Sequence, residues 1–312
     1  MTDKTLYLHV GWSKTGTSAV QNAINSNSEL FLKKDILYPK SVQWNDHSHH
    51  KFALAFNETS GYSSEFTLND AISAVEKELL ESNCQSVLIS SELSPFYFDF
   101  KEFRNFVDRN FNNVVVIFSL RLQSELILSL FNQLVKDPNV RYPGSIFSLT
   151  MANIEWMDYY NTVKKWEAVV GKENIKIFLH SKHIVGDFLD FFTIEKQVRN
   201  TKDSKEVNVS VPNQLLPAIK QINVNVVDPV QYKKNLDEVI AQFNSIAELR
   251  TPGILYSIPE QRMLDNYYKV SNSKLAKEYF GRNELFEAKQ YKPVMFTPLA
   301  VLRQLSKLNK AD

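Results

Sequence analysis

Residues Leu6–Ser18, with the sequence LYLHVGWSKTGTS, decide the fold of this chain. They read as an apolar strand, a short loop with two glycines and one lysine, and the start of a helix. Backbone N–H groups at a helix N-terminus attract an anion, and the helix dipole strengthens the attraction. Lysine adds a mobile positive charge, and hydroxyl side chains add donors. We therefore predict an anion-binding loop, with the candidate residues Ser13, Lys14, Thr15, Gly16, Thr17 and Ser18.

The order of residues in this loop differs from the Walker A motif, G-x-x-x-x-G-K-[ST], because Lys14 precedes Gly16. The order K-[ST]-G-T-[ST] directly after a first strand resembles the 5′-phosphosulfate loop of sulfotransferases that use 3′-phosphoadenosine 5′-phosphosulfate (PAPS). The resemblance implies that PAPS is the donor of a sulfuryl group. It also implies that no metal is needed, since Lys14 and the backbone donors carry the electrostatic load.

Composition is that of an ordinary globular enzyme. The 312 residues are 44% hydrophobic and 23% charged with a formal net charge of +1, so nothing global indicates a nucleic-acid or membrane-surface partner. The single Cys84 excludes an intrachain disulfide framework and fits a reducing compartment. No stretch approaches the ~20 apolar residues of a membrane span, and the first apolar run is too short for a signal peptide. We expect a cytoplasmic protein.

Apolar runs alternate with helical patterns in the first part of the chain, which indicates βαβ units around a parallel sheet. We predict a P-loop-like three-layer α/β/α fold with a helical C-terminal extension. The core would be residues 1–200, and 201–312 would be a helical part packed on the same domain, without strands after about residue 195. The predicted strands are Thr5–Val10, Ser86–Ser90, Val114–Phe118 and Ile175–Leu179, and the predicted helices are 17–31, 68–82, 99–109, 121–136, 152–170 and 182–193.

A second candidate anion site follows the strand Val114–Phe118. Arg121 leaves the end of this strand, where its planar fork can grip a phosphate, and Ser129 comes eight residues later. The pair resembles the 3′-phosphate site of sulfotransferases. The alternative is a surface arginine and a solvated helix serine. The Lys14 loop earlier in the chain favours the ligand role, because two anion sites at strand ends suit a nucleotide with 3′ and 5′ phosphates.

Glu92 ends the segment Ser86–Glu92, a strand followed by Ser-Ser-Glu. A carboxylate there is placed to take the proton of an acceptor. The segment resembles one in carbohydrate sulfotransferases in which a glutamate is the base. The alternative is a carboxylate at the start of a helix, favoured by the helix dipole, since Pro95 follows closely.

The histidine cluster Asp46–His50 offers a rival base. Some related sulfotransferases use histidine, so His50 or His47 stays open as the catalytic base. A zinc site lacks cysteine or paired-carboxylate partners at ligand spacing, and a solvated helix start is the plain alternative. His9 is expected to pack in the core or to orient the loop, and His180 receives no role.

Further segments are similar to those of bacterial carbohydrate sulfotransferases: Gly186–Phe192, Asn208–Ser210 and Ser271–Gly281. The arginine-lysine-glycine loop of cytosolic aryl and steroid sulfotransferases is absent, which favours the carbohydrate branch. Contacts to the 3′-phosphate and adenine from that side would then come from Lys202, Lys205 or Asn208. The residues expected to bind a sugar acceptor are Trp12, Trp44, His47 and Tyr97.

The sequence thus predicts a PAPS-dependent sulfotransferase that acts on a hydroxyl, or an amine, of a carbohydrate or glycolipid. Glu92 would be the base, and Lys14 would stabilise the leaving group. One alternative is a P-loop kinase, which predicts a G-K-[ST] order and a strand-end aspartate that are both missing. The other is a protein that binds the nucleotide or a glycan without turnover. The acceptor's identity and the oligomeric state stay open.

Overall fold

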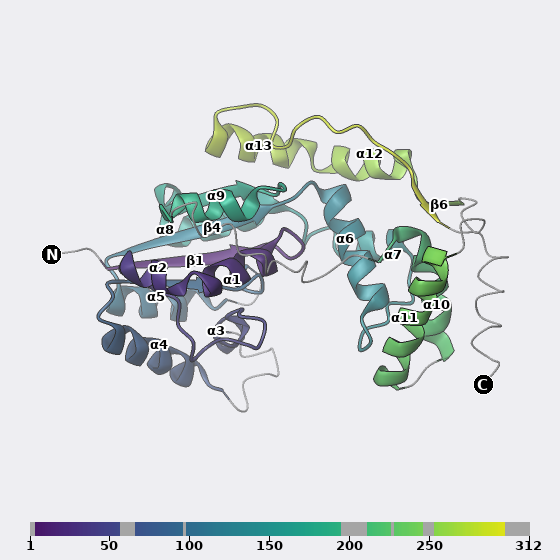
Figure 1. Cartoon of the computed structure of the whole chain (residues 1–312). Coiled ribbons are helices and arrows are strands. Elements are labelled where there is room, and N and C mark those ends of the chain that lie inside the picture. Colours follow the sequence, from purple (N-terminus) through teal and green to yellow (C-terminus); the bar gives the residue numbers. More distant parts are fainter. Residues whose placement is uncertain are drawn as a thin grey trace. The chain divides into compact units, whose positions relative to one another are not determined.

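The computed structural model describes residues 4–56, 66–95, 98–194, 211–225, 228–245 and 253–296 (Figure 1). The chain divides into two compact units. Unit 1 consists of Met1–Arg121 and Tyr159–Val207, and unit 2 of Leu122–Asp158 and Asn208–Asp312. Residues 122–158, which we expected in the N-terminal core, therefore group by their contacts with the C-terminal part.

The described part of unit 1 is built on a five-stranded sheet in the order β2-β3-β1-β4-β5, and each neighbouring pair is parallel. The four predicted strands are confirmed. β1, β3 and β4 are mostly buried apolar runs, whereas the edge strand β5 has the exposed Lys176 among its apolar residues. The prediction missed the short edge strand β2, whose two residues carry no pattern. The strands are β1 Thr5–Gly11, β2 Ile36–Leu37, β3 Ser86–Ser90, β4 Asn113–Leu120 and β5 Ile175–Leu179.

Helices cover both faces of this sheet, as the three-layer prediction requires. On one face, buried side chains of α1, α2 and α9 form a cluster with Leu88 and Ile117 of the sheet. On the other face, α3, α5 and α8 share aromatic contacts such as Phe52–Phe106 and Phe103–Trp166. The helices of unit 1 are α1 Thr17–Ser26, α2 Ser28–Lys33, α3 His50–Ala55, α4 Leu68–Ser82, α5 Phe100–Asn110, α8 Tyr159–Val170 and α9 Ile184–Phe191.

Unit 2 is mainly helical, but it contains a small antiparallel sheet of β6 and β7. The expectation that no strands follow residue 195 is therefore wrong. Such short strands have no local sequence pattern, because they form by pairing with residues distant in the sequence. Asp265 of α12 accepts hydrogen bonds from the backbone N–H and the hydroxyl of Ser124 at the start of α6. The elements are α6 Gln123–Lys136, α7 Ile146–Ala152, α10 Leu216–Asn225, α11 Pro229–Ser245, β6 Gly253–Tyr256, α12 Ile258–Tyr267, α13 Lys269–Phe280 and β7 Val294–Phe296.

His9 joins the three central strands of unit 1. Its Nδ1 lies 2.8 Å from the hydroxyl of Ser90 on β3, and its Nε2 lies 3.1 Å from the hydroxyl of Ser119 on β4. The ring is fully buried, and burial lowers its pKa to about 3. His9 is therefore a neutral core residue that fixes the strand ends, which agrees with the role expected from the sequence.

This buried ring predicts an acid-sensitive unit 1. The folded-state pKa of His9 is about 3 against an ordinary 6.5, so between these values the unfolded chain binds a proton that the folded chain does not. The free energy of unfolding should therefore fall as the pH drops through this window. For His9 alone the loss between about pH 7 and pH 5 is about 2 kcal/mol.

Urea titrations followed by tryptophan fluorescence at the two pH values measure this loss. His9→Gln should be less stable at neutral pH but should lose less than the wild type on acidification. His183→Gln, at the exposed N-cap of α9, should keep the full wild-type loss. Equal losses in the wild type and His9→Gln would contradict the prediction.

Candidate active site

Three polar segments of unit 1 meet at the carboxyl edge of its sheet. Because β1 lies between β3 and β4, the loop after β1 is flanked by Glu92, after β3, and by Arg121, after β4. This edge is where parallel α/β sheets bind ligands. The structure thus brings together the three segments that we had placed at strand ends, with the Lys14 loop in the middle.

The loop enters α1 through unusual backbone angles. Lys14 has a φ of 65° and Gly16 a φ of 92°, in the left-handed region that suits glycine. Gly16 is the N-cap of α1, where no side chain caps the helix and the first turn contains no acidic residue. The first N–H groups of α1 therefore face neither a capping side chain at Gly16 nor a carboxylate of the first turn, which suits an anion site.

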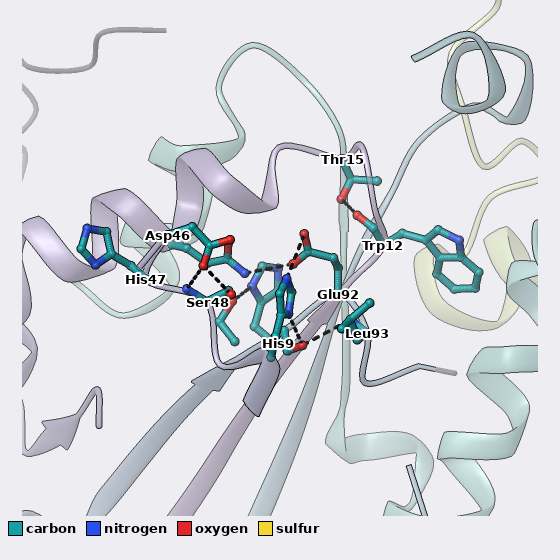
Figure 2. Close-up of polar contacts among 12 residues, drawn as sticks. His9, Trp12, Thr15, Asp46, His47, Ser48, Glu92 and Leu93 are labelled. Carbon is teal, nitrogen blue, oxygen red and sulfur yellow. Dashed lines mark hydrogen bonds and ion pairs between the residues drawn. The ribbon is translucent and has the colours of Figure 1, made fainter. Parts of the chain in front are cut away.

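Four carbonyl groups of the loop accept hydrogen bonds within unit 1. The Arg121 Nη1 donates to the Lys14 carbonyl at 3.2 Å, and the His180 Nδ1–H donates to that of Thr15 at 2.9 Å. The Trp12 carbonyl accepts from the Thr15 hydroxyl at 2.5 Å, and that of Gly16 accepts from an N–H of α1. Figure 2 shows the Thr15–Trp12 bond. His180 thus has a role that the sequence analysis did not assign, although it directly follows β5.

Two residues predicted to contact a ligand are fully buried. The Thr15 hydroxyl donates to the Trp12 carbonyl, and the part of Thr15 in binding an anion stays a prediction. Trp12 is also fully buried and packs edge-on against Tyr159, with ring centroids 4.7 Å apart. A fully buried ring offers no face to a sugar. Trp12 instead supports the loop, and Tyr159 donates to the Arg121 carbonyl at 2.5 Å.

Glu92 lies directly beside the start of α1. A Cβ atom added to Gly11, whose φ is 62°, would stand 2.5 Å from Cγ2 of Thr17 and 3.2 Å from Cβ of Glu92. The Gln21 Nε2 donates to Oε2 of Glu92 at 3.0 Å. Glu92 belongs to a turn, and α5 begins only at Phe100 with Asp99 as its cap. The described residues around Glu92 therefore do not form the helix start that we considered as an alternative.

His50 is the histidine of the cluster that lies beside Glu92. Its Nε2 is 3.9 Å from Oε1 of Glu92, and its Nδ1 is 2.8 Å from the Ser91 hydroxyl. The ring of the partly exposed Trp44 stands perpendicular to that of His50, with centroids 5.0 Å apart. The ring of His47 points away from Glu92 in Figure 2. The two candidate bases, Glu92 and His50, therefore lie side by side.

The remaining residues of the cluster hold this segment in place. His49 accepts the backbone N–H of Ser90 at Nδ1 and donates from Nε2 to the Pro39 carbonyl, and burial lowers its pKa to about 3. Burial opposes ionisation of Asp46, but hydrogen bonds from Ser48 outweigh this effect and lower the carboxyl pKa (Figure 2). Within the described residues, no group of three or more histidine, cysteine or acidic side chains could hold a metal ion.

Several predicted residues lie elsewhere. Ser129 belongs to α6 in unit 2, so its pairing with Arg121 stays a prediction. Tyr97 lies outside the described residues, as do Lys202, Lys205 and Asn208. Among the residues that the structure describes, no helix is long and apolar enough to cross a membrane.

No protein-family model matches the chain, and no curated protein sequence does. Solved structures with some likeness include a sulfotransferase from Alicyclobacillus acidocaldarius, at 17% identity, 76% coverage of this chain and 91% of that one, and a TM-score of 0.40. A mouse sulfotransferase complexed with PAP has 10% identity, 89% and 88% coverage, and a TM-score of 0.43. Retinol dehydratase in a complex with retinol and PAP has 11% identity, 94% and 84% coverage, and a TM-score of 0.31. The likeness is distant and bears on no residue of the site.

The close approach at Gly11 predicts a severe effect of Gly11→Ala. A methyl group there meets Thr17 at 2.5 Å, and the positive φ adds strain, whereas Gly281 has a similar φ of 64° with nothing within 4 Å. Gly281→Ala should therefore cost only the backbone strain of about 1 kcal/mol. Gly11→Ala should cost about 1–3 kcal/mol more, because its surroundings are overpacked.

Urea titrations of the two variants measure the difference. Equal losses of stability in the two variants would contradict the close packing of Thr17 and Glu92 around Gly11.

Proposed function

We propose that this chain is a sulfotransferase that takes a sulfuryl group from PAPS and transfers it to a hydroxyl, or an amine, of a carbohydrate or glycolipid. The observation that carries the proposal is the adjacency of the Lys14 loop, Glu92 and Arg121 at three neighbouring strand ends. The loop supplies an anion site, Glu92 a base and Arg121 a second cation. This combination suits the transfer of an anionic group from a nucleotide that carries phosphates at two positions.

The donor side of the proposal rests on the loop. Its carbonyl groups are bonded within the protein, while the uncapped N-terminus of α1 leaves N–H groups for an anion. These features fit the 5′-phosphosulfate of PAPS. Lys14 would neutralise the charge that grows on the bridging oxygen as the sulfur–oxygen bond breaks. Arg121 would bind the 3′-phosphate.

The acceptor side rests on Glu92. The acceptor oxygen would form a bond to sulfur while its proton passes to the Glu92 carboxylate, and the electron pair of the broken bond would leave with adenosine 3′,5′-bisphosphate (PAP). The side chain of Glu92 is only 16% exposed, so it meets solvent and ligand through a small opening. Trp44, which is partly exposed and stands against His50, would contact a sugar ring.

PAP should bind without Mg²⁺ and more tightly than ATP with Mg²⁺, because the proposed site offers two cationic contacts and needs no metal. Isothermal titration calorimetry measures both affinities. Strong binding of ATP with Mg²⁺ and none of PAP would contradict the proposal and favour a kinase.

Arg121→Ala tests the same site. It should weaken PAP binding by about 2–4 kcal/mol, since a charge-assisted contact is lost while the phosphate stays buried. Adenosine 5′-phosphosulfate, which lacks the 3′-phosphate, should lose much less. Arg109→Ala is the control, because Arg109 pairs with Glu76 on the surface of unit 1. Equal losses for both ligands would show that Arg121 acts through the Lys14 carbonyl, which it also bonds, and not on the 3′-phosphate.

Glu92→Gln should keep the affinity for PAP but lower the rate of transfer from PAPS by about 10²–10⁴-fold, because a base acts on the acceptor and not on the donor. Glu81→Gln, an exposed change on α4, should leave the rate unchanged. Release of PAP from PAPS across a panel of glycans, glycolipids and amines measures transfer.

The histidine variants decide between the two candidate bases. Near-full activity of Glu92→Gln with an inactive His50→Ala or His47→Ala would assign the base to histidine. PAP binding by a wild-type protein that transfers to no acceptor would instead favour a protein that binds without turnover.

A further inference from the structure

Both oxygens of the Glu92 carboxylate face a polar side chain from another element. Gln21 on α1 donates to Oε2 at 3.0 Å, and Nε2 of His50 on α3 faces Oε1 at 3.9 Å. Gln21 is 1% exposed and His50 is 8% exposed, so both groups are more deeply buried than the carboxylate that they face. Polar side chains are buried at a cost unless they are bonded, which gives these contacts weight.

The hydrogen bonds around Ser91 favour one position for the ring proton of His50. The backbone N–H of Leu93 donates to the Ser91 hydroxyl at 3.3 Å, and this hydroxyl lies 2.8 Å from Nδ1 of His50. The hydroxyl that accepts from Leu93 is free to donate its own proton to Nδ1. The ring proton then sits on Nε2, facing the carboxylate. The other tautomer would turn a lone pair toward a negatively charged oxygen, which is repulsive.

We propose that Gln21 and His50 are positioning residues of Glu92: Gln21 donates to one carboxylate oxygen and the ring of His50 stands against the other, so that together they hold the carboxylate in a fixed orientation. The inference rests on the proposed function for its meaning in catalysis. The Gln21 amide orients a carboxylate without the strong charge of a lysine or arginine, which would make the group a weaker base. The ring proton of His50 stays on His50 during the reaction, and only Glu92 receives the proton of the acceptor.

Gln21 also connects the base to the donor loop. It lies four residues after Thr17 on α1, so both side chains are on the same face of the helix, and Thr17 is the residue packed over Gly11 beside Glu92. Helix α1, which begins at the predicted anion loop, therefore contacts Glu92 through its second turn. A shift of α1 at its N-terminus moves the donor of this hydrogen bond, so binding of an anion and orientation of Glu92 are mechanically linked.

Three variants test the roles of the two residues in catalysis. His50→Ala and Gln21→Met, which keeps the volume of the side chain, should each lower kcat by about 10–100-fold with little change in the KM for PAPS, because small misplacements of a reacting group have effects of this size. His50→Gln offers an N–H donor close to the position of Nε2 and should recover most of the rate. His183→Gln, the same change at an exposed histidine, should have wild-type kcat.

A readout that needs no turnover separates this inference from the proposed function. Long-range ¹H–¹⁵N spectra of the imidazole rings report the tautomer of His50, assigned by its absence in His50→Gln. The proton is expected on Nε2 in the wild type, whether or not the protein transfers a sulfuryl group. A proton on Nδ1 would overturn the assignment. In an active enzyme, a His50→Gln variant as slow as His50→Ala, or effects confined to KM, would overturn it as well.

Discussion

The absence of a side chain at Gly11 is the constraint on which the site depends. Any larger residue would push Thr17 and Glu92 apart, because the space for a Cβ is already taken by both. Gly11 ends the central strand, and the shift in pairing between His9 and Gly11 turns the chain into the loop. One glycine therefore brings the start of α1 within contact of the residue after β3. The anion loop and the carboxylate are then parts of one packed group.

The fold was predictable where the signal is local. Apolar runs bounded by polar residues predicted β1, β3, β4 and β5, and a buried parallel sheet produces this pattern. β2 and the sheet of β6 and β7 were missed, because strands of so few residues are fixed by pairing with distant partners. Residues 122–158 belong to unit 2 by their contacts, but no change in amino-acid composition along the sequence marks their boundaries.

The site was predictable only in outline. The rule that parallel strands carry ligand residues at their carboxyl ends brought Lys14, Glu92 and Arg121 to one edge. The same rule applied to β5 would have drawn attention to His180. The contact of Gln21 with Glu92 spans 71 residues of sequence and has no local signal. The prediction that Trp12 contacts a sugar failed for a related reason. A tryptophan in a polar loop is expected to be exposed, and only its packing against the distant Tyr159 shows that it is buried.

The hydrogen bonds of its carbonyl groups suit the loop to bind an anion. The carbonyl of Thr15 and the N–H of Gly16 belong to one planar trans peptide and point in opposite directions. His180 donates to this carbonyl, so the N–H of Gly16 points away from His180, whereas the N–H of Thr15 belongs to a fully buried residue. Arg121 donates to the neighbouring carbonyl of Lys14. A loop with its acceptors bonded internally presents mainly donors to a ligand. The ordering is completed during folding, so an anion that binds there loses little affinity to arranging the backbone.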